Sequence, residues 1–252
     1  RNNALNQMNA LLDEFIDAKE YGSILQPKEC DWALLSRFVE DTTPDQQVSF
    51  DEDGLEDTQA QLRLMIAQGQ ALAQKYHAVV TNPPYMGGSG MSAKLSNFVK
   101  NNYPDSKSDL FAVFMERCRQ MAVNNGFQAM ITQHSWMFLS SFEKLRTKLL
   151  TVDIVNMAHL GARAFEEIGG EVVQTTSFVM RKSHVADYKG EYCRLIEPTT
   201  QQGKEDMFLA GENRYAADQS NFSKIPGAPV AYWASDTARA AYQFPNMDQI
   251  AQ

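Results

Sequence analysis

The stretch from His77 to Gly90, HAVVTNPPYMGGSG, constrains the fold of this chain more than any other segment. Its first part, AVVT, has the small and β-branched residues of a buried strand. Two consecutive prolines follow, and because proline has a fixed φ and no backbone N–H, neither a strand ladder nor a helix continues through them. The strand therefore ends at Asn82. An amide side chain and the ring of Tyr85 are left just beyond that end, where ligand sites lie in open α/β sheets.

The chain after residue 76 alternates between strand and helix patterns. Strands are predicted at 77–81, 127–133, 152–160 and 171–183, and helices at 94–104, 108–126 and 140–150. Ser108 is the expected cap of the second helix, and Ser140 with Glu143 has capping-box spacing at the third. No helix pattern separates the last two strands, so an antiparallel pair at the sheet edge is expected. The alternation predicts an α/β sheet with helices on its faces.

The two ends of the chain differ from this alternating part. Before residue 77, apolar residues recur at helical spacing in 4–19, 30–40 and 57–75, and the acidic stretch 41–57 is expected to be an exposed loop. After residue 200 the sequence is polar and weakly periodic. We therefore expect a helical lead-in (1–76), an α/β domain (77–200) and a linker (201–252).

Composition narrows the class of protein. No run of about 18 apolar residues occurs and the N-terminus lacks a signal-peptide pattern, so we expect a cytoplasmic protein without a membrane span. Three widely spaced cysteines and four scattered histidines have no metal-ligand spacing, so no metal site is expected. The net charge of −8 is unlike that of a free-standing nucleic-acid binder, although a catalytic module can use the basic surface of another domain.

The residue types in Asn-Pro-Pro-Tyr point to a ligand with a planar amino group. The Asn82 side chain and the Pro83 carbonyl are two acceptors in a rigid arrangement, and Tyr85 is a flat ring beside them. Two hydrogen bonds from a conjugated –NH₂ group draw its nitrogen toward a tetrahedral shape and localise the lone pair, which can then attack a methyl carbon. The alternative is a simple tight turn. The following MGGSG fits neither a P-loop nor a nucleophile elbow, and we expect it to be a mobile flap.

Other residues have two interpretations each. His134 follows a predicted strand end, so it either lines the substrate cleft or has a structural role. Trp136 is expected to be buried against the sheet rather than to stack on a ligand. Lys144, Arg146 and Lys148 fall on one predicted helix face, which either meets phosphate groups or is simply solvated.

Five sequence blocks in a fixed order resemble the amino-directed DNA methyltransferases of the N6-adenine class. VVTNPPYMGG resembles their motif IV, SKSDLFAVFMERCRQMAVNNG motif V with its helix, GFQAMITQHSWMF motif VI, and HLGARAFEEIGGEVVQTTSFVMRK motifs VII and VIII. FSKIPGAPVAYW resembles a segment that follows the catalytic domain in large enzymes of this kind. The resemblance covers roughly residues 10–235. It is nearest to the adenine-specific methyltransferases of BREX phage-defence systems, which are related to type IIG restriction-modification enzymes.

This resemblance implies a fold, a reaction and a set of site residues. The fold is the C-terminal half of a Rossmann-like methyltransferase sheet, in which 77–200 is a partial catalytic domain. The methyl donor is S-adenosylmethionine and the acceptor is a flipped-out adenine of double-stranded DNA. Asn82 and the Pro83 carbonyl would hold the N6 amino group. Pro84 would stiffen the segment and Tyr85 would stack on the base.

Two further residues take their roles from the resemblance alone. Phe165 falls where the family places a second aromatic contact to the flipped base, and the alternative is that it is a core residue. Asp109 falls near the place where the family's cofactor pocket is closed, and a charge at a helix N-terminus explains it equally well.

The family's cofactor-binding unit, a strand followed by a glycine-rich turn and a helix, has no counterpart in residues 1–76, whose glycines are Gly22, Gly54 and Gly69. We therefore expect a fragment, lacking its target-recognition domain, that is inactive by itself and binds S-adenosylmethionine weakly or not at all. The parent protein is expected to bind DNA and other defence-system subunits. Two alternatives stay open: a methyltransferase for glutamine side-chain amides, whose acceptor is also a planar –NH₂, and a catalytically incomplete scaffold module.

Overall fold

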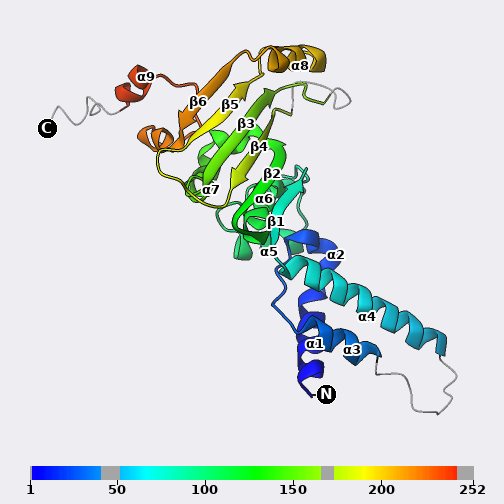
Figure 1. Ribbon diagram of the computed structural model, residues 1–252. Coiled ribbons are helices and arrows are strands. Elements are labelled where there is room, and N and C mark those ends of the chain that lie inside the picture. Colours follow the sequence, from blue (N-terminus) through cyan, green and yellow to red (C-terminus); the bar gives the residue numbers. More distant parts are fainter. Residues whose placement is uncertain (1, 41–51, 166–172, 243–252) are drawn as a thin grey trace. The chain divides into compact units, whose positions relative to one another are not determined.

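The computed structural model describes residues 2–40, 52–165 and 173–242, and the chain separates into two compact units, Arg1–Lys75 and Tyr76–Gln252 (Figure 1). No helix in the part of the chain that the structure describes is long and apolar enough to cross a membrane.

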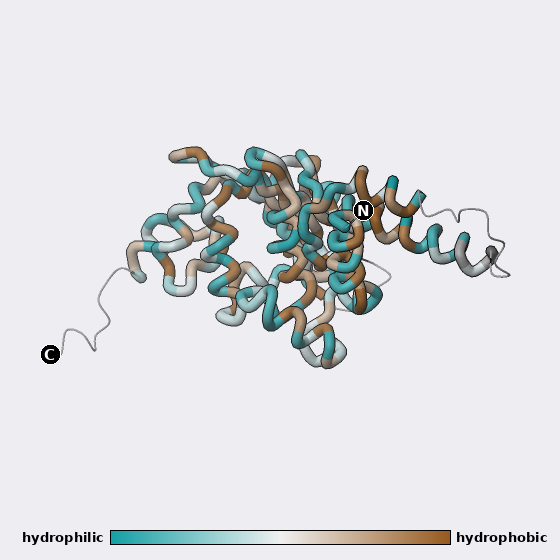
Figure 2. Tube along the Cα trace, turned by 90° about the horizontal axis from the view of Figure 1, so that it is seen from below, coloured by the Kyte–Doolittle hydropathy of each residue, from teal (hydrophilic) through white to brown (hydrophobic). Residues whose placement is uncertain are grey.

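The first unit consists of helices. They are α1 (Asn2–Phe15), α2 (Ala18–Tyr21), the 3₁₀ turn η1 (Gly22–Ile24), α3 (Trp32–Glu40) and α4 (Glu52–Ala73). Hydrophobic and hydrophilic residues alternate along the helices near the N-terminus, as amphipathic helices require (Figure 2). The apolar stripes meet in a small core of Met8, Leu11, Leu35, Val39 and Ile66. The helical prediction for this part is confirmed, although α4 begins earlier than residue 57. The part of the predicted loop at 41–51 lies outside the described residues.

The second unit is built on a six-stranded mixed sheet with the order β1-β2-β4-β3-β5-β6. The strands are β1 (Tyr76–Thr81), β2 (Ala122–Gln133), β3 (Asp153–Gly161), β4 (Thr175–Arg181), β5 (Lys189–Arg194) and β6 (Arg214–Asp218). Its helices are α5 (Ala93–Asn102), α6 (Leu110–Met121), α7 (Glu143–Leu149), α8 (Gln201–Leu209) and α9 (Asp236–Ala241). The pairs β1–β2 and β3–β5 are parallel and the others antiparallel. The α/β fold class is therefore confirmed.

The sheet is larger than the sequence pattern indicated. The antiparallel pair formed by β3 and β4 is present, but β4 lies between β2 and β3, and β5 and β6 extend the sheet beyond β3, so the pair is not at the edge. Within the polar stretch 201–242 the structure contains α8, β6, the 3₁₀ turn η5 (Gln219–Lys224) and α9. These elements and β5 are short, and too few apolar residues recur in them to give a detectable period.

Two predicted helix starts are wrong. Asp109 rather than Ser108 caps α6, because the Asp109 carboxylate accepts the backbone N–H of Phe111 at 3.2 Å. Ser140 does not cap α7 with Glu143, since residues Ser140–Phe142 form a 3₁₀ turn (η4) and α7 begins only at Glu143.

The end of α6 also differs from the prediction. The helix ends at Met121 and β2 begins at once with Ala122, whereas the pattern extended the helix to residue 126. A bulge absorbs the intervening residues, because Tyr76 pairs with Ala122 but Ala78 pairs with Phe127. The Asn-Asn-Gly sequence inside this bulge has the composition of a helix end, which explains the error.

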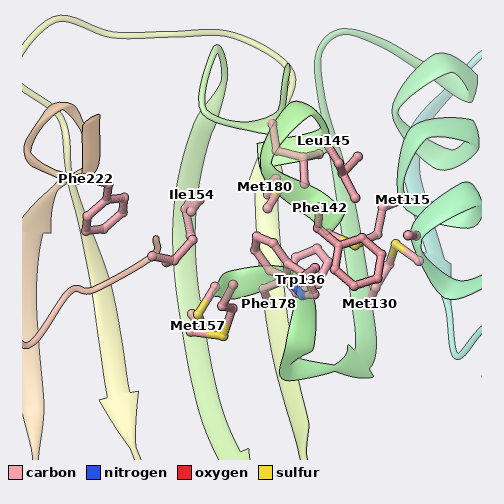
Figure 3. Packing of buried hydrophobic residues seen from close by; sticks show 14 of the residues in the cluster. Met115, Met130, Trp136, Phe142, Leu145, Ile154, Met157, Phe178, Met180 and Phe222 are labelled. Carbon is pink, nitrogen blue, oxygen red and sulfur yellow. The ribbon is translucent and has the colours of Figure 1, made fainter. Parts of the chain in front are cut away.

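One face of the sheet carries the main core. Alternate residues of the central strands pack there against α6, α7 and the turns that precede α7 (Figure 3). Members of this cluster include Phe111, Met115, Met130, Trp136, Phe142, Leu145, Ile154, Met157, Phe178 and Met180. Because β4 runs antiparallel to both β2 and β3, those two strands run in the same direction as β1. The segments that follow β1, β2 and β3 therefore leave the sheet at the same edge.

Candidate active site

The segment after β1 presents the predicted acceptors. Residues 82–86 form neither helix, strand nor turn, so the simple-turn alternative is not what the structure contains. Asn82 is exposed, Pro83 is buried and Pro84 is exposed. The buried proline anchors the backbone while the neighbouring amide faces solvent. Proline fixes its own φ and restricts the backbone of the residue before it, so the Pro83 carbonyl and the backbone of Asn82 are held in a small range of directions.

Tyr85 is fixed against the core. Its ring is half-buried and meets Phe111 edge to face, with centroids 6.1 Å apart and planes at 84°. Burial raises the pKa of the Tyr85 phenol to about 12, so the group is neutral near pH 7. Its hydroxyl oxygen is buried and has no hydrogen-bond partner among the described residues. The ring is therefore rigid, and its polar end has an unused donor.

Asp109 fastens this segment to the start of α6. Its Oδ1 accepts the backbone N–H of Met86 at 3.0 Å and that of Phe111 at 3.2 Å. Leu110 N–H donates to the Met86 carbonyl at 3.0 Å, and Gly87 forms a bridge with Asp109. Burial raises the pKa of the Asp109 carboxyl, and the backbone N–H donors oppose that rise. The helix-cap role is thus present in the structure, while the cofactor role stays a prediction.

The other oxygen of Asp109 is still available. No residue in the described part of the chain donates a hydrogen bond to Oδ2. The glycine-rich segment that begins at Gly87 continues into a 3₁₀ turn, η2 (Gly88–Gly90). A ligand amino group could use Oδ2 without displacing a protein donor.

His134 lies at the same edge of the sheet, directly after β2. It begins the 3₁₀ turn η3 (His134–Met137), and its Nδ1 is 2.8 Å from Nε2 of His159 on β3. His159 Nδ1 is in turn 3.1 Å from the hydroxyl of Tyr232. Burial lowers the pKa of the His134 imidazole, so it is uncharged near pH 7.

The loop after β3 carries Phe165, and hydrogen bonds from α8 hold this loop and the end of β3. Phe165 is half-buried. Gln201 of α8 donates to the Ala164 carbonyl at 3.0 Å, and the buried Lys204 Nζ donates to the Leu160 carbonyl at 2.6 Å. Thus Asn82, His134 and the Phe165 loop leave the sheet at one edge, after β1, β2 and β3, with β4 between β2 and β3.

The basic helix face is not present as predicted. Arg146 is buried at 1% exposure, and it donates to the carbonyls of Trp136, Leu139 and Gly227. Lys148 forms ion pairs with nearby carboxylates. Trp136 is fully buried, as expected. Arg146 therefore fastens backbone segments and Lys148 is paired with carboxylates, whereas Lys144 is exposed.

Sequence reasoning missed His159, Tyr232 and Trp233 as neighbours of the site. His159 occupies an ordinary inward position of a strand. Only its contact with His134, across the sheet, shows that it lies next to the site. Tyr232 and Trp233 lie in the last of the five blocks that resemble the methyltransferase family, and this resemblance was a signal that they lie near the site. Among the residues that the structure describes, no group of three or more His, Cys, Asp or Glu side chains could hold a metal ion.

The chain is thus an α/β protein whose candidate site, the Asn82–Tyr85 segment, lies beyond the end of a parallel strand. The chain belongs to the Eco57I restriction-modification methylase family, whose model matches residues 11–165.

Two curated relatives are similar along most of the chain. The adenine-specific methyltransferase PglX of Lacticaseibacillus casei (strain Zhang) is 46% identical over 236 residues, which cover 90% of this chain and 20% of that protein. The adenine-specific methyltransferase BrxX of Escherichia coli O9:H4 (strain HS) is 44% identical over 223 residues, which cover 88% of this chain and 18% of that protein. The chain thus spans about a fifth of the length of these relatives.

A solved structure supports the fold. The cryo-EM structure of a DrdV–DNA complex is similar over 73% of this chain and 21% of that chain, with a TM-score of 0.51 and 15% sequence identity. At this level of identity the likeness concerns the arrangement of the elements, and it agrees with the family assignment.

Proposed function

We propose that this chain supplies the part of a DNA methyltransferase that binds the target amine, and that the complete protein transfers a methyl group from S-adenosylmethionine to N6 of adenine in double-stranded DNA. The observation that carries the proposal is the exposed Asn82 amide beside the anchored Pro83 and the fixed Tyr85 ring. The names of the two curated relatives and the DNA complex of the solved neighbour support the choice of substrate.

The two acceptors would activate the amine. Asn82 Oδ1 and the Pro83 carbonyl each accept one N6–H, which holds the nitrogen in place and localises its lone pair. S-adenosylmethionine, when bound, supplies a methyl carbon attached to a positively charged sulfur. Asn82 Oδ1 and the Pro83 carbonyl would hold N6 so that its lone pair faces this methyl group, and the proton that N6 loses after the transfer would pass to water. Since the oxygens accept hydrogen bonds more strongly as positive charge grows on N6, they stabilise the transition state more than the ground state.

Aromatic rings would hold the flipped base. Tyr85 offers a rigid face at no further cost in side-chain freedom, because Phe111 already fixes its ring. Stacking on an aromatic side chain is worth about 1–3 kcal/mol per base. Phe165, which is half-buried in the loop after β3, is proposed as a second aromatic contact to the base. His134 is proposed to line the same cleft.

Asp109 is the residue that fits the methyl donor. The free Oδ2 matches the ammonium group of S-adenosylmethionine in charge and in hydrogen-bonding type. The rest of that molecule needs a cradle of backbone N–H groups, which the described residues around Asp109 do not form. The proposal is therefore that this chain holds one end of the methyl donor.

The substrate and the product test the proposed function. The complete protein that contains this chain is incubated with labelled methyl donor and either duplex DNA or glutamine-containing peptides, and digested products are identified by mass spectrometry. The proposal predicts N6-methyladenine in DNA. Methylated glutamine with unmodified DNA would instead favour the amide methyltransferase, and no transfer to either substrate would favour the scaffold alternative.

A further inference from the structure

A chain of hydrogen bonds connects the substrate edge with the C-terminal part of the second unit. His134 Nδ1 lies 2.8 Å from His159 Nε2, and His159 Nδ1 lies 3.1 Å from the Tyr232 hydroxyl oxygen. His134 is half-buried, whereas His159 and Tyr232 are 4% and 3% exposed. The chain of bonds therefore begins at the site and ends in the interior.

Aromatic rings surround these three side chains. Phe138 meets His134 edge to face at 5.4 Å, and Trp233 packs against His159 at 6.4 Å. Tyr192 stacks on Tyr232 with centroids 4.7 Å apart and planes at 9°. This packing leaves the rings little freedom to rotate, so the hydrogen bonds keep their partners.

Both histidines are neutral. Burial lowers the pKa of His159 to about 3, and the positive charges of Arg194 and Lys204 act in the same direction. Burial also lowers the pKa of His134. A neutral imidazole has one N–H and one bare nitrogen, so each ring donates once and accepts once.

Tyr232 decides the direction of the chain of bonds. Within the described residues, His159 Nδ1 is the one partner of the Tyr232 hydroxyl. If His159 donated to this oxygen, the phenolic proton would be buried without an acceptor, which is costly. Tyr232 therefore donates to His159 Nδ1, and His159 then carries its proton on Nε2 and donates it to His134 Nδ1. His134 is left with its own proton on Nε2, which has no partner among the described residues.

We infer that His134 is a specificity-determining donor, whose tautomer is set by Tyr232 through His159, and that its Nε2–H donates to a ring nitrogen of the bound base. The inference rests on the proposed function and adds a residue role to it. Two ring nitrogens flank the N6 amino group of adenine, N1 and N7, and both are acceptors. Guanine has a donor at N1 and an oxygen in place of the amino group, so a fixed acceptor–donor pattern at this edge distinguishes the two purines.

A ring nitrogen fits this donor better than a phosphate oxygen does. His134 is uncharged and lies among aromatic rings, whereas phosphate groups are bound in proteins mainly by cationic side chains or clustered backbone N–H groups. The position of His134 in the sheet also agrees with a ring nitrogen as the acceptor. Thr81, the residue before Asn82, pairs with Met130, and His134 follows β2 four residues later at the same edge.

The first experiment measures the tautomer directly. Nitrogen-15 NMR of histidine-labelled chain at pH 7.5 distinguishes protonated from bare ring nitrogens at His134. The inference predicts a proton on Nε2 in the wild type and a mixture of tautomers in Tyr232→Phe. Tyr192→Phe is the matched control, because it removes a hydroxyl of the same stack that is buried without a partner in the described residues. A proton on Nδ1 of His134 in the wild type overturns the inference, whatever the activity of the protein.

The second experiment identifies the acceptor by its removal. Methylation by the complete protein is compared for DNA containing adenine, 1-deazaadenine, 7-deazaadenine or, as a control, 3-deazaadenine. We expect His134→Ala to lower kcat/KM about tenfold on adenine and on 3-deazaadenine, as the loss of one hydrogen bond does. On one of the other two analogues the variant and the wild type should be equal, and Tyr232→Phe should follow the same pattern with a smaller loss.

The outcomes separate this inference from the proposed function. If the wild type methylates adenine but His134→Ala loses the same factor on all four substrates, the role of His134 is structural and the inference fails alone. If His134→Ala instead loses methylation activity only at high salt, and by the same factor on all four substrates, the His134 proton is donated to a phosphate oxygen. The assignment to a ring nitrogen of the base then fails. If the wild type methylates no DNA, the proposed function fails, and the tautomer measurement still stands or falls independently.

Discussion

Tyr85 has a hydroxyl group that the fold itself does not use. The oxygen is buried and has no partner among the described residues, while the ring packs on Phe111. An unsatisfied buried hydroxyl costs about 1–3 kcal/mol. Phenylalanine would pack in the same place at lower cost. A tyrosine at this position is therefore better explained by binding than by folding, and its two parts can be tested separately.

We predict that Tyr85→Phe is at least as stable as the wild type and gains an advantage at alkaline pH. Burial raises the pKa of Tyr85 from its usual value of 10 to about 12. As the pH rises, the phenol therefore ionises in the unfolded state before it ionises in the folded state, and this favours unfolding. The stability contributed by the neutral phenol is complete below pH 10 and is lost as the pH rises from 10 to 12. Urea unfolding at pH 8 and pH 11 measures this, with the exposed Tyr242→Phe as control. A clear loss of stability in Tyr85→Phe at pH 8 would show that the hydroxyl has a partner.

The Asp109 carboxylate joins helix α6 to the segment that follows β1. It caps α6 and holds the Met86 end of the Asn-Pro-Pro-Tyr segment through a second backbone N–H. We predict that Asp109→Ala costs about 1–2 kcal/mol of unfolding free energy, as the loss of a cap does, and also lowers methylation several-fold.

The matched control is Asp31→Ala in the first unit, where Asp31 Oδ1 accepts the Leu34 N–H at 2.9 Å at the start of α3. It should lose comparable stability in thermal unfolding and keep its methylation rate. Equal rates in both variants at a temperature where both are folded would mean that Asp109 is only a helix cap.

The elements were predictable where they were long and periodic. The four strands and the helices between them follow from apolar spacing and from the prolines after β1, and the candidate residues Asn82 and Tyr85 follow from the same stretch. The strands β5 and β6 were not predictable, because KGEYCR and RYAAD become strands by pairing with β3 and with each other. His159 could not be assigned to the site for a similar reason, since its partner is 25 residues away in sequence.

At the scale of the whole molecule, the chain contains one part of the proposed reaction. It spans about a fifth of the length of its curated relatives, and Asp109 is the residue that we propose for the methyl donor. We therefore predict that the isolated chain binds S-adenosylmethionine weakly or not at all, and that the complete protein binds it tightly. Isothermal titration calorimetry of both measures the difference. Tight, stoichiometric binding by the 252-residue chain would mean that it holds a full cofactor site.

The net charge supports the same division of tasks. At −8, this chain repels a polyanion, and Arg146 and Lys148 of α7 are engaged with carbonyls and carboxylates. Affinity for duplex DNA is therefore expected to come from other parts of the complete protein, while this chain supplies the chemistry at the flipped base.

The rate of methyl transfer in a single turnover with Asn82 altered tests the proposed function most directly. The complete protein is saturated with methyl donor and duplex DNA, and the formation of N6-methyladenine is followed for the wild type, Asn82→Ala and Asn124→Ala, an exposed asparagine outside the site segment. We predict a fall of at least about a hundredfold for Asn82→Ala, because one of the two acceptors on N6 is lost, and no change for Asn124→Ala. A rate for Asn82→Ala that equals the wild-type rate would contradict the proposal that a strand-end acceptor pair activates the amine.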